Sequence, residues 1–341
     1  MALYFSIQHA QVFHTRCRLN KENRGSAIKN FITQTGVEGH SPHISKEKIA
    51  FKCEKISCRH TFVRAIPEQQ AGSREVEDSE EFSSKLVLVV GGTGGVGQLV
   101  VARLLDRGIR MRVLIRDPKK AETLFGKQDA DKLQVFVGDT RHPKELDSSV
   151  FEGVTHVICC TGTTAFPSRR WDGDNTPEKT DWDGVRNLVA ASGSSLKRFV
   201  LVSSVGVTKF DELPWSIMNL FGVLKFKKMG EEFLKSSGIP FTIIRPGRLT
   251  DGPYTSYDLN TLLKATAGTR HAVLIGQGDN LVGEASRHDV AEACIQALDM
   301  ECAVGQIYEI NSIEGNGPGM DQEKWEKLFK NANVCLEELN V

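Results

Sequence analysis

A glycine-rich turn between a strand-like run and a helix-like run constrains the fold more than any other feature. Residues 85–105 read KLVLVVGGTGGVGQLVVARLL. Leu86–Val90 is continuously apolar, as expected for a central parallel strand covered on both faces. The turn after it must bend sharply and bring the backbone close to a ligand, which glycine permits because it has no Cβ. We therefore expect this turn to open a strand–helix–strand unit of an α/β fold.

The same turn predicts a binding site for the pyrophosphate of a dinucleotide. Free N–H groups at the start of a helix, together with the positive end of the helix dipole, suit such an anion. Gly97 is expected to let the first helical turn pack tightly on the strand. A glycine turn without a ligand is the alternative, but the strand–turn–helix context favours the dinucleotide. The expected contacts in the turn are Gly91, Thr93, Gly94, Gly95, Val96 and Gly97.

Strand-like and helix-like segments alternate along residues 85–312, which predicts one domain with a doubly wound parallel sheet. The predicted strands are Leu86–Val90, Met111–Ile115, Leu133–Val137, Thr155–Cys160, Phe199–Ser203, Phe241–Arg245 and Ile307–Ile310. The predicted helices are Gly95–Arg107, Asp183–Ala191, Val223–Ser236 and Asp289–Leu298, the last with Asp289 as its N-cap. Residues 313–341 are predicted as a C-terminal tail with one short peripheral helix over 322–331.

The N-terminal 66 residues differ in composition from the rest of the chain. They contain eleven Lys and Arg but four acidic residues, no Asp, and no apolar core near the N-terminus. An acid-poor leader that contains Arg is typical of a plastid or mitochondrial transit peptide, and a disordered basic tail is the alternative. Residues 67–84 are predicted as an acidic linker. We expect a chloroplast protein, in the stroma or at the thylakoid surface.

Composition also argues against several classes of function. Residues 67–341 hold 32 basic and 39 acidic side chains, so nucleic acid is not expected as the main partner. The chain has no run of 18 apolar residues, so no transmembrane helix is expected. The histidines and cysteines are scattered without the spacing of metal ligands, so we expect no metal site and free, reduced thiols.

The residues at the end of the second predicted strand indicate which dinucleotide is bound. An acid there favours a free ribose 2′-hydroxyl, and an Arg favours a 2′-phosphate. Arg116 comes first, followed by Asp117 and two lysines, so NADP(H) is favoured over NAD(H) because a guanidinium can bind phosphate with two hydrogen bonds. The alternative is that Asp117 binds the ribose. Further expected cofactor contacts are Asp139 beside the adenine and Thr161 and Gly162 near the nicotinamide ribose.

Several motifs in this order resemble the atypical, NmrA-like NAD(P)H-binding branch of the short-chain dehydrogenase/reductase superfamily, a branch that includes many plastid proteins. The resemblance covers about residues 85–310. It rests on GGTGGVG (91–97), IRDPKKA (115–121), GDT (138–140), DWDGVRNLVAA (181–191), FVLVSSVGV (199–207), SGIPFTIIRPGRL (237–249) and SRHDVAEACIQAL (286–298).

The resemblance implies catalytic residues, with one departure. Active members of the superfamily use a Ser on or after the fifth strand and a Tyr-x-x-x-Lys on the next helix. Ser203 and Lys227 fall at the Ser and Lys positions, whereas Val223 falls at the Tyr position. Two functions stay open: an NADPH-dependent reductase of a small organic substrate, and a non-catalytic NADP(H)-binding scaffold, redox sensor or assembly factor. The apolar segment 214–221 is interpreted as core packing, with a pocket wall, a membrane contact at the thylakoid or a dimer contact as alternatives.

Overall fold

The computed structural model describes residues 85–167, 171–250 and 272–337. The predicted transit peptide (1–66) and acidic linker (67–84) lie outside the described residues. The described helices are α2 (Gly97–Asp106), α3 (Pro118–Phe125), α4 (Gly184–Ala191), α5 (Trp215–Met218), α6 (Val223–Ser236), α8 (Arg287–Gln296) and α9 (Gln322–Glu337). A π-helical stretch, Glu178–Asp183, leads into α4, and single 3-10 turns lie at Pro143–Glu145, Ser148–Val150 and Glu301–Ala303.

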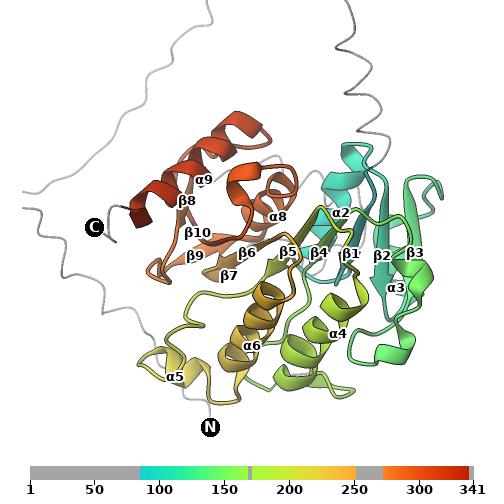
Figure 1. Cartoon of the computed structure of the whole chain (residues 1–341), viewed down its shortest axis with the longest axis horizontal. Helices are drawn as coiled ribbons and strands as arrows, with labels where there is room; N and C mark the ends of the chain where they lie inside the picture. Colours follow the sequence, from blue (N-terminus) through green and yellow to red (C-terminus); the bar gives the residue numbers. More distant parts are fainter. Residues whose placement is uncertain (1–84, 168–170, 251–271, 338–341) are drawn as a thin grey trace, which may run out of the picture. The chain divides into compact units, whose positions relative to one another are not determined.

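An eight-stranded sheet in the order β3-β2-β1-β4-β5-β6-β10-β8 forms the centre of the fold (Figure 1). Its strands are β1 (Val87–Val90), β2 (Met111–Ile115), β3 (Leu133–Val137), β4 (His156–Cys159), β5 (Arg198–Val202), β6 (Phe241–Pro246), β8 (Ala272–Gly276) and β10 (Gln306–Ile313). All neighbours in this sheet pair in parallel except β8 and β10. A second, two-stranded sheet pairs β7 (Arg248–Thr250) with β9 (Glu284–Ser286). The predicted doubly wound parallel sheet in one domain is therefore confirmed.

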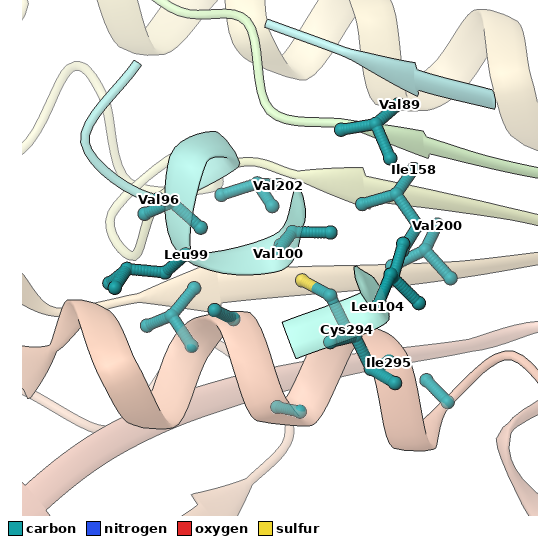
Figure 2. Packing of buried hydrophobic residues seen from close by; sticks show 14 of the residues in the cluster. Val89, Val96, Leu99, Val100, Leu104, Ile158, Val200, Val202, Cys294 and Ile295 are labelled. Carbon is teal, nitrogen blue, oxygen red and sulfur yellow. The ribbon is translucent and has the colours of Figure 1, made fainter. Parts of the chain in front are cut away.

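Alternation along the central strands builds two hydrophobic layers, one on each face of the sheet. In β1, Val87 and Val89 belong to the layer under α2 and α8, whereas Leu88 and Val90 belong to the layer under α4 and α6. Successive side chains of a strand point to opposite faces, so a fully apolar strand can fill both layers. Figure 2 shows the first layer, where Val89 and neighbouring strand residues pack on α2 and α8.

The C-terminal part differs from the prediction. The segment predicted as a tail with one short peripheral helix contains α9, which is longer than expected and packs into the core through Trp325 and Phe329, both fully buried. The two aromatic residues are four positions apart, so they lie on one face of the helix. Strand β8 was not predicted at all.

The start of α8 also differs from the prediction. The helix begins at Arg287, and the Ser286 hydroxyl accepts the N-cap hydrogen bond from the His288 N–H. Asp289, predicted as the N-cap, lies inside the helix and accepts a 2.6 Å hydrogen bond from the Ser312 hydroxyl. Either side chain can cap a helix, so the sequence alone does not decide between them.

Candidate dinucleotide and active site

A cavity of about 420 Å³ lies where the strand order reverses between β1 and β4. Crevices at the carboxyl ends of parallel strands, at such a reversal, are the usual ligand sites of open α/β sheets. The predicted cofactor residues that line it are Gly91, Thr93, Gly94, Gly95, Arg116, Asp139, Thr161 and Gly162. Val96 and Gly97 do not line it, because the Val96 side chain packs in the core and Gly97 faces the turn itself.

Two glycines make the sharp turn possible. A Cβ on Gly97 would lie 2.7 Å from the Gly91 carbonyl carbon, so a side chain there would force α2 away from β1. Gly91 has a φ of 79°, and a Cβ on it would lie 2.9 Å from the backbone nitrogen of Thr161. The turn therefore brings the ends of β1 and β4 closer than a residue with a side chain would allow.

Free backbone donors at the start of α2 fit the phosphates of a dinucleotide. The Gly94 N–H closes the turn on the Gly91 carbonyl at 2.9 Å. Within the described part of the chain, the N–H groups of Thr93, Gly95 and Val96 make no hydrogen bond, and no acidic residue lies in the first turn of α2. These donors and the positive end of the helix dipole match an anion, so the residues present fit the predicted pyrophosphate.

Cationic side chains surround the end of the cavity beside β2 and β3. Arg116, Lys120 and Arg141 all line it. Arg141 binds the Asp139 carboxylate through two of its nitrogens, at 2.5 to 3.0 Å. Burial raises the pKa of Asp139, but the hydrogen bonds and charge of Arg141 outweigh that effect and hold the pKa below its ordinary value. Asp117, by contrast, caps α3 by accepting from the Lys119 N–H at 3.0 Å and does not line the cavity.

The predicted catalytic residues Ser203 and Lys227 lie together in a second, smaller cavity of about 10 Å³. Thr161 lines this cavity as well as the larger one, so the two adjoin at the end of β4. The Ser203 hydroxyl is buried and has no partner among the described residues. A hydroxyl in that situation is free to bind a water or an atom of a bound molecule.

Asp181 is the residue of this site that the sequence analysis missed. Its carboxylate lies 2.7 Å from the Lys227 ammonium, and the Thr163 N–H and hydroxyl also donate to it. Asp181 is 1% exposed and comes from the π-helical stretch before α4. The only sequence signal was its place at the start of the DWDG motif, which gave no reason to pair it with a lysine 46 residues away.

Val223, at the position of the superfamily's tyrosine, packs in a small apolar cluster with Val207 and Leu224. Among the described residues the only tyrosine is Tyr308, whose ring packs on Phe329 in the core. At the position of the tyrosine the structure therefore places a buried valine, which has no proton to donate.

The apolar segment 214–221 is more exposed than core packing would make it. Leu213 beside it is 77% exposed and Leu220 is 69% exposed, while only Trp215 turns inward, over Gly206. Phe221 packs edge-on against both Phe166 and Trp171. The interpretation as core packing is thus wrong for most of the segment, because α5 is a single turn in which no side chain is fully buried and only Trp215 packs partly against an apolar cluster.

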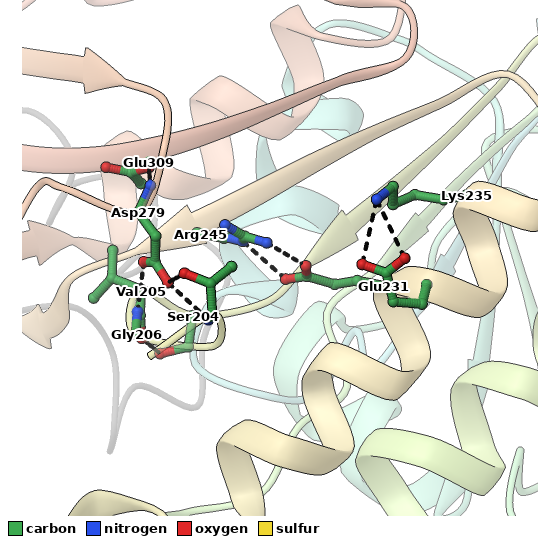
Figure 3. A network of polar contacts seen from close by, with 10 residues as sticks. Ser204, Val205, Gly206, Glu231, Lys235, Arg245, Asp279 and Glu309 are labelled. Carbon is green, nitrogen blue, oxygen red and sulfur yellow. Dashed lines mark hydrogen bonds and ion pairs between the residues drawn. The ribbon is translucent and has the colours of Figure 1, made fainter. Parts of the chain in front are cut away.

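A buried polar network holds the loops near this segment (Figure 3). Asp279, after β8, accepts hydrogen bonds from the Gly206 and Thr208 N–H groups at 2.6 and 2.9 Å. Its own N–H donates to Glu309 of β10. Next to it, Arg245 of β6 binds Glu231 of α6 through two hydrogen bonds of 2.6 and 3.0 Å. The loop after β5 is therefore anchored to the far half of the sheet.

Neither a membrane-spanning helix nor a metal site is found in the described residues. No helix there is long and apolar enough to cross a bilayer, and no group of three or more His, Cys, Asp or Glu side chains could hold a metal ion.

Comparisons with known proteins agree with the fold and the cavity. A family model described as NAD(P)H-binding matches residues 91–301. The fold resembles that of the oxidoreductase YlbE from Lactococcus lactis, with a TM-score of 0.54 and 17% identity, over 73% of this chain and 97% of that one. An identity this low shows the fold alone.

Curated relatives include chloroplast proteins and a reductase. An uncharacterized chloroplastic protein of Arabidopsis thaliana is 31% identical over 71% of this chain and 74% of its own. The sanguinarine reductase of Eschscholzia californica is 28% identical over 73% of this chain and 97% of its own. The photosystem II assembly factor Ycf39 of Trieres chinensis is 30% identical over 67% of this chain and 64% of its own. With the glycine turn, the sheet order and the family match agreeing, this chain belongs to the NAD(P)H-binding family of atypical short-chain dehydrogenases/reductases.

Proposed function

We propose that this protein is a chloroplast reductase that uses NADPH to reduce a small organic substrate. The observation that supports this most is the second cavity, where Ser203 and Lys227 meet beside the dinucleotide cavity. Ser203, directly after β5, and Lys227 of α6 line one cavity, and Thr161 lines both this cavity and the cofactor cavity.

The residues at the small cavity would each have a different role in such a reaction. A bound NADPH would supply the hydride. Asp181 fixes the Lys227 ammonium 2.7 Å away, next to the position expected for the nicotinamide ribose. The Ser203 hydroxyl, which has no partner among the described residues, would donate a hydrogen bond to a substrate oxygen. Lys227 would be the proton source, because an ammonium is a far stronger acid than the hydroxyls of Ser203 and Thr161.

The preference for NADPH over NADH is part of the proposal. Arg116, Lys120 and Arg141 give the adenosine end of the cavity three cations, and Asp139 is paired with one of them. Asp117, which could have bound a ribose 2′-hydroxyl, caps α3 instead. A net positive pocket at the end of β2 suits a 2′-phosphate.

Binding and turnover test the proposal separately. The full chain is titrated with NADPH and NADH by calorimetry, and NADPH consumption is then followed with a panel of carbonyl, imine and enone substrates. We expect Lys227→Ala to lower turnover at least about a hundredfold, since single catalytic proton donors contribute on that order. Lys225→Ala, an exposed lysine on the same helix, is the matched control and should keep full activity. Cofactor binding without turnover of any substrate would contradict the reductase.

A second candidate is a non-catalytic NADP(H)-binding scaffold or redox sensor at the thylakoid surface. Two observations favour it: Val223 puts an apolar side chain at the tyrosine position, and segment 214–221 presents Ile217, Leu220 and Phe221 to solvent. Exposed apolar patches of this kind commonly mark contacts with proteins or membranes. In this case, cosedimentation with isolated thylakoids should change when NADPH is added. No change, together with turnover of a substrate, would exclude it.

The chloroplast location rests on the sequence of residues 1–66 and on the chloroplastic relative. Fusing residues 1–66 to a fluorescent protein should direct it into chloroplasts. Cytosolic or mitochondrial fluorescence would contradict the location and leave the proposed chemistry untouched.

A further inference from the structure

The loop formed by residues 171–177, which leads into the π-helical stretch, lies at the adenosine end of the dinucleotide cavity. Arg116, at the end of β2, donates a hydrogen bond from Nη1 to the Asn175 side-chain oxygen of this loop. Arg141, after β3, donates from Nη1 to the Gly173 carbonyl at 2.5 Å. Both arginines and Asn175 line the same cavity. Residues that follow two neighbouring strands, β2 and β3, thus hold this loop beside the position expected for the adenosine ribose.

The loop is shaped so that Asn175 faces the cavity. Its backbone N–H donates to the Trp171 carbonyl at 3.1 Å, and its side-chain Nδ2 donates to the Asp172 carbonyl at 2.7 Å. Asp174, just before it, has a φ of 65°, a left-handed conformation that reverses the chain direction. Because the amide nitrogen is bound within its own loop, the amide oxygen is left to accept from Arg116.

The two arginines differ in how their charge is balanced. Arg141 is paired with the Asp139 carboxylate. Arg116 is exposed, makes no ion pair with a described carboxylate, and is held by the neutral amide of Asn175. A neutral acceptor can orient a guanidinium without cancelling its charge, so the remaining N–H groups of Arg116 stay available to an anion.

We propose that Asn175 is a positioning residue that holds Arg116 over the ribose 2′ position, and so sets the preference for a dinucleotide with a 2′-phosphate. The proposal rests on the proposed function, because it assumes that NADPH occupies the cavity. It adds a determinant from a loop about 60 residues from Arg116 in sequence, which the residues at the end of β2 do not reveal.

The test uses the ratio of two dissociation constants measured on the full chain by calorimetry, for NADPH and for NADH. The fragments adenosine 2′,5′-bisphosphate and 5′-AMP isolate the adenosine end. In Asn175→Asp a carboxylate would pair with Arg116 and repel the phosphate. We expect the NADPH constant to rise about tenfold or more while the NADH constant stays within about threefold, since a charge-assisted hydrogen bond is worth at least that much.

Asn175→Ala provides the second variant, in which the guanidinium loses its anchor but keeps its charge. Its preference for NADPH should fall by a smaller factor, about threefold, and more at low salt than at high salt. Asn331→Asp, an exposed asparagine on α9, makes the same change of charge far along the chain and should leave the ratio unchanged. Thermal melting confirms that each variant is folded.

The outcomes separate this inference from the proposed function. If the wild-type chain prefers NADPH and both Asn175 variants keep the same ratio, the positioning role is wrong and the proposed function stands. If both variants weaken the binding of NADPH and of NADH by the same factor, the loop contributes to the binding of either dinucleotide without distinguishing the 2′-phosphate. The inference is then also overturned. A wild-type chain without preference between the two dinucleotides would overturn the NADPH preference and this inference together.

Discussion

Gly97 leaves less room for a side chain than Gly94, although both belong to the same glycine turn. A Cβ on Gly97 would overlap the Gly91 carbonyl group, whereas a Cβ on Gly94 would lie 3.2 Å from the Gly91 oxygen. We expect Gly97→Ala to lower the free energy of unfolding by about 2–3 kcal/mol and Gly94→Ala by less than about 1 kcal/mol. Urea unfolding of the two variants measures the difference. Equal costs would mean that the turn relaxes without loss of close packing.

In the Lys227–Asp181 pair the Asp181 carboxylate is fully buried and the Lys227 side chain is mostly buried, so removing one partner leaves an unbalanced charge. Asp181→Ala would strand the Lys227 ammonium and the Thr163 N–H. We expect it to lower the free energy of unfolding by about 3–5 kcal/mol. In a double-mutant cycle, adding Lys227→Ala should cost less than the sum of the single changes. Costs that add within about 0.5 kcal/mol would show that the two groups are not coupled.

These residues also show what the sequence could predict about the site. Ser203 and Lys227 follow from the register of the motifs, because each lies at a fixed place on a strand or helix. Asp181 and Asn175 could not be found that way. Each acts through a contact with an element far along the chain, Asp181 with Lys227 of α6 and Asn175 with Arg116 after β2, and only the folded sheet brings those elements together.

Asp279 joins two elements that are distant in sequence, the loop after β8 and the loop after β5 (Figure 3). It is 3% exposed and accepts from the buried Gly206 N–H and from the partly buried Thr208 N–H. In Asp279→Ala both donors would lose their partner, at about 1–3 kcal/mol for the buried Gly206 N–H and less for the Thr208 N–H, which water can reach. We expect the loop after β5, including segment 214–221, to open more often and to be cut faster by limited proteolysis.

The control for this experiment is Asp106→Ala, which removes an exposed carboxylate at the end of α2. Its digestion should match that of the wild-type chain. If Asp279→Ala is cut at the same rate as Asp106→Ala, the hydrogen bonds of Asp279 do not hold the loop, and the packing of Trp215 is enough.

The accuracy of the predicted elements follows the strength of the local pattern. The bounds of β2, β3 and α6 agree with the prediction. The two strands are short, mostly apolar runs, and α6 begins directly after Gly222. Strand β8 was not predicted, although β3 at the opposite edge of the sheet also mixes buried and exposed positions, so a place at the edge does not by itself explain the difference. Its pairing with β10 is a tertiary contact that local sequence does not encode.

His156 places a buried, titratable ring at the amino-terminal end of a central strand. It begins β4 and pairs with Val87 of β1 on one side and Arg198 of β5 on the other. Burial, reinforced by the positive charge of Lys85, lowers the pKa of His156 to about 4. Because β4 pairs with strands on both sides, we expect protonation of this ring to lower the stability of the whole sheet rather than that of one loop.

Because the pKa of His156 is lower in the folded protein than in the unfolded chain, acid is expected to destabilise the fold. Between the unfolded pKa of about 6.5 and the folded value of about 4, the unfolded chain binds the extra proton, so stability falls as the pH falls. We expect the free energy of unfolding to decrease by about 2–3 kcal/mol from pH 7 to pH 4 through this residue. His156→Gln should be less stable at pH 7, because it changes a buried ring, yet its stability should vary less over this range. Urea midpoints measured at half-unit steps from pH 7 to pH 4 give both curves. If they run parallel, His156 does not bind the destabilising proton, and other groups account for the sensitivity to acid.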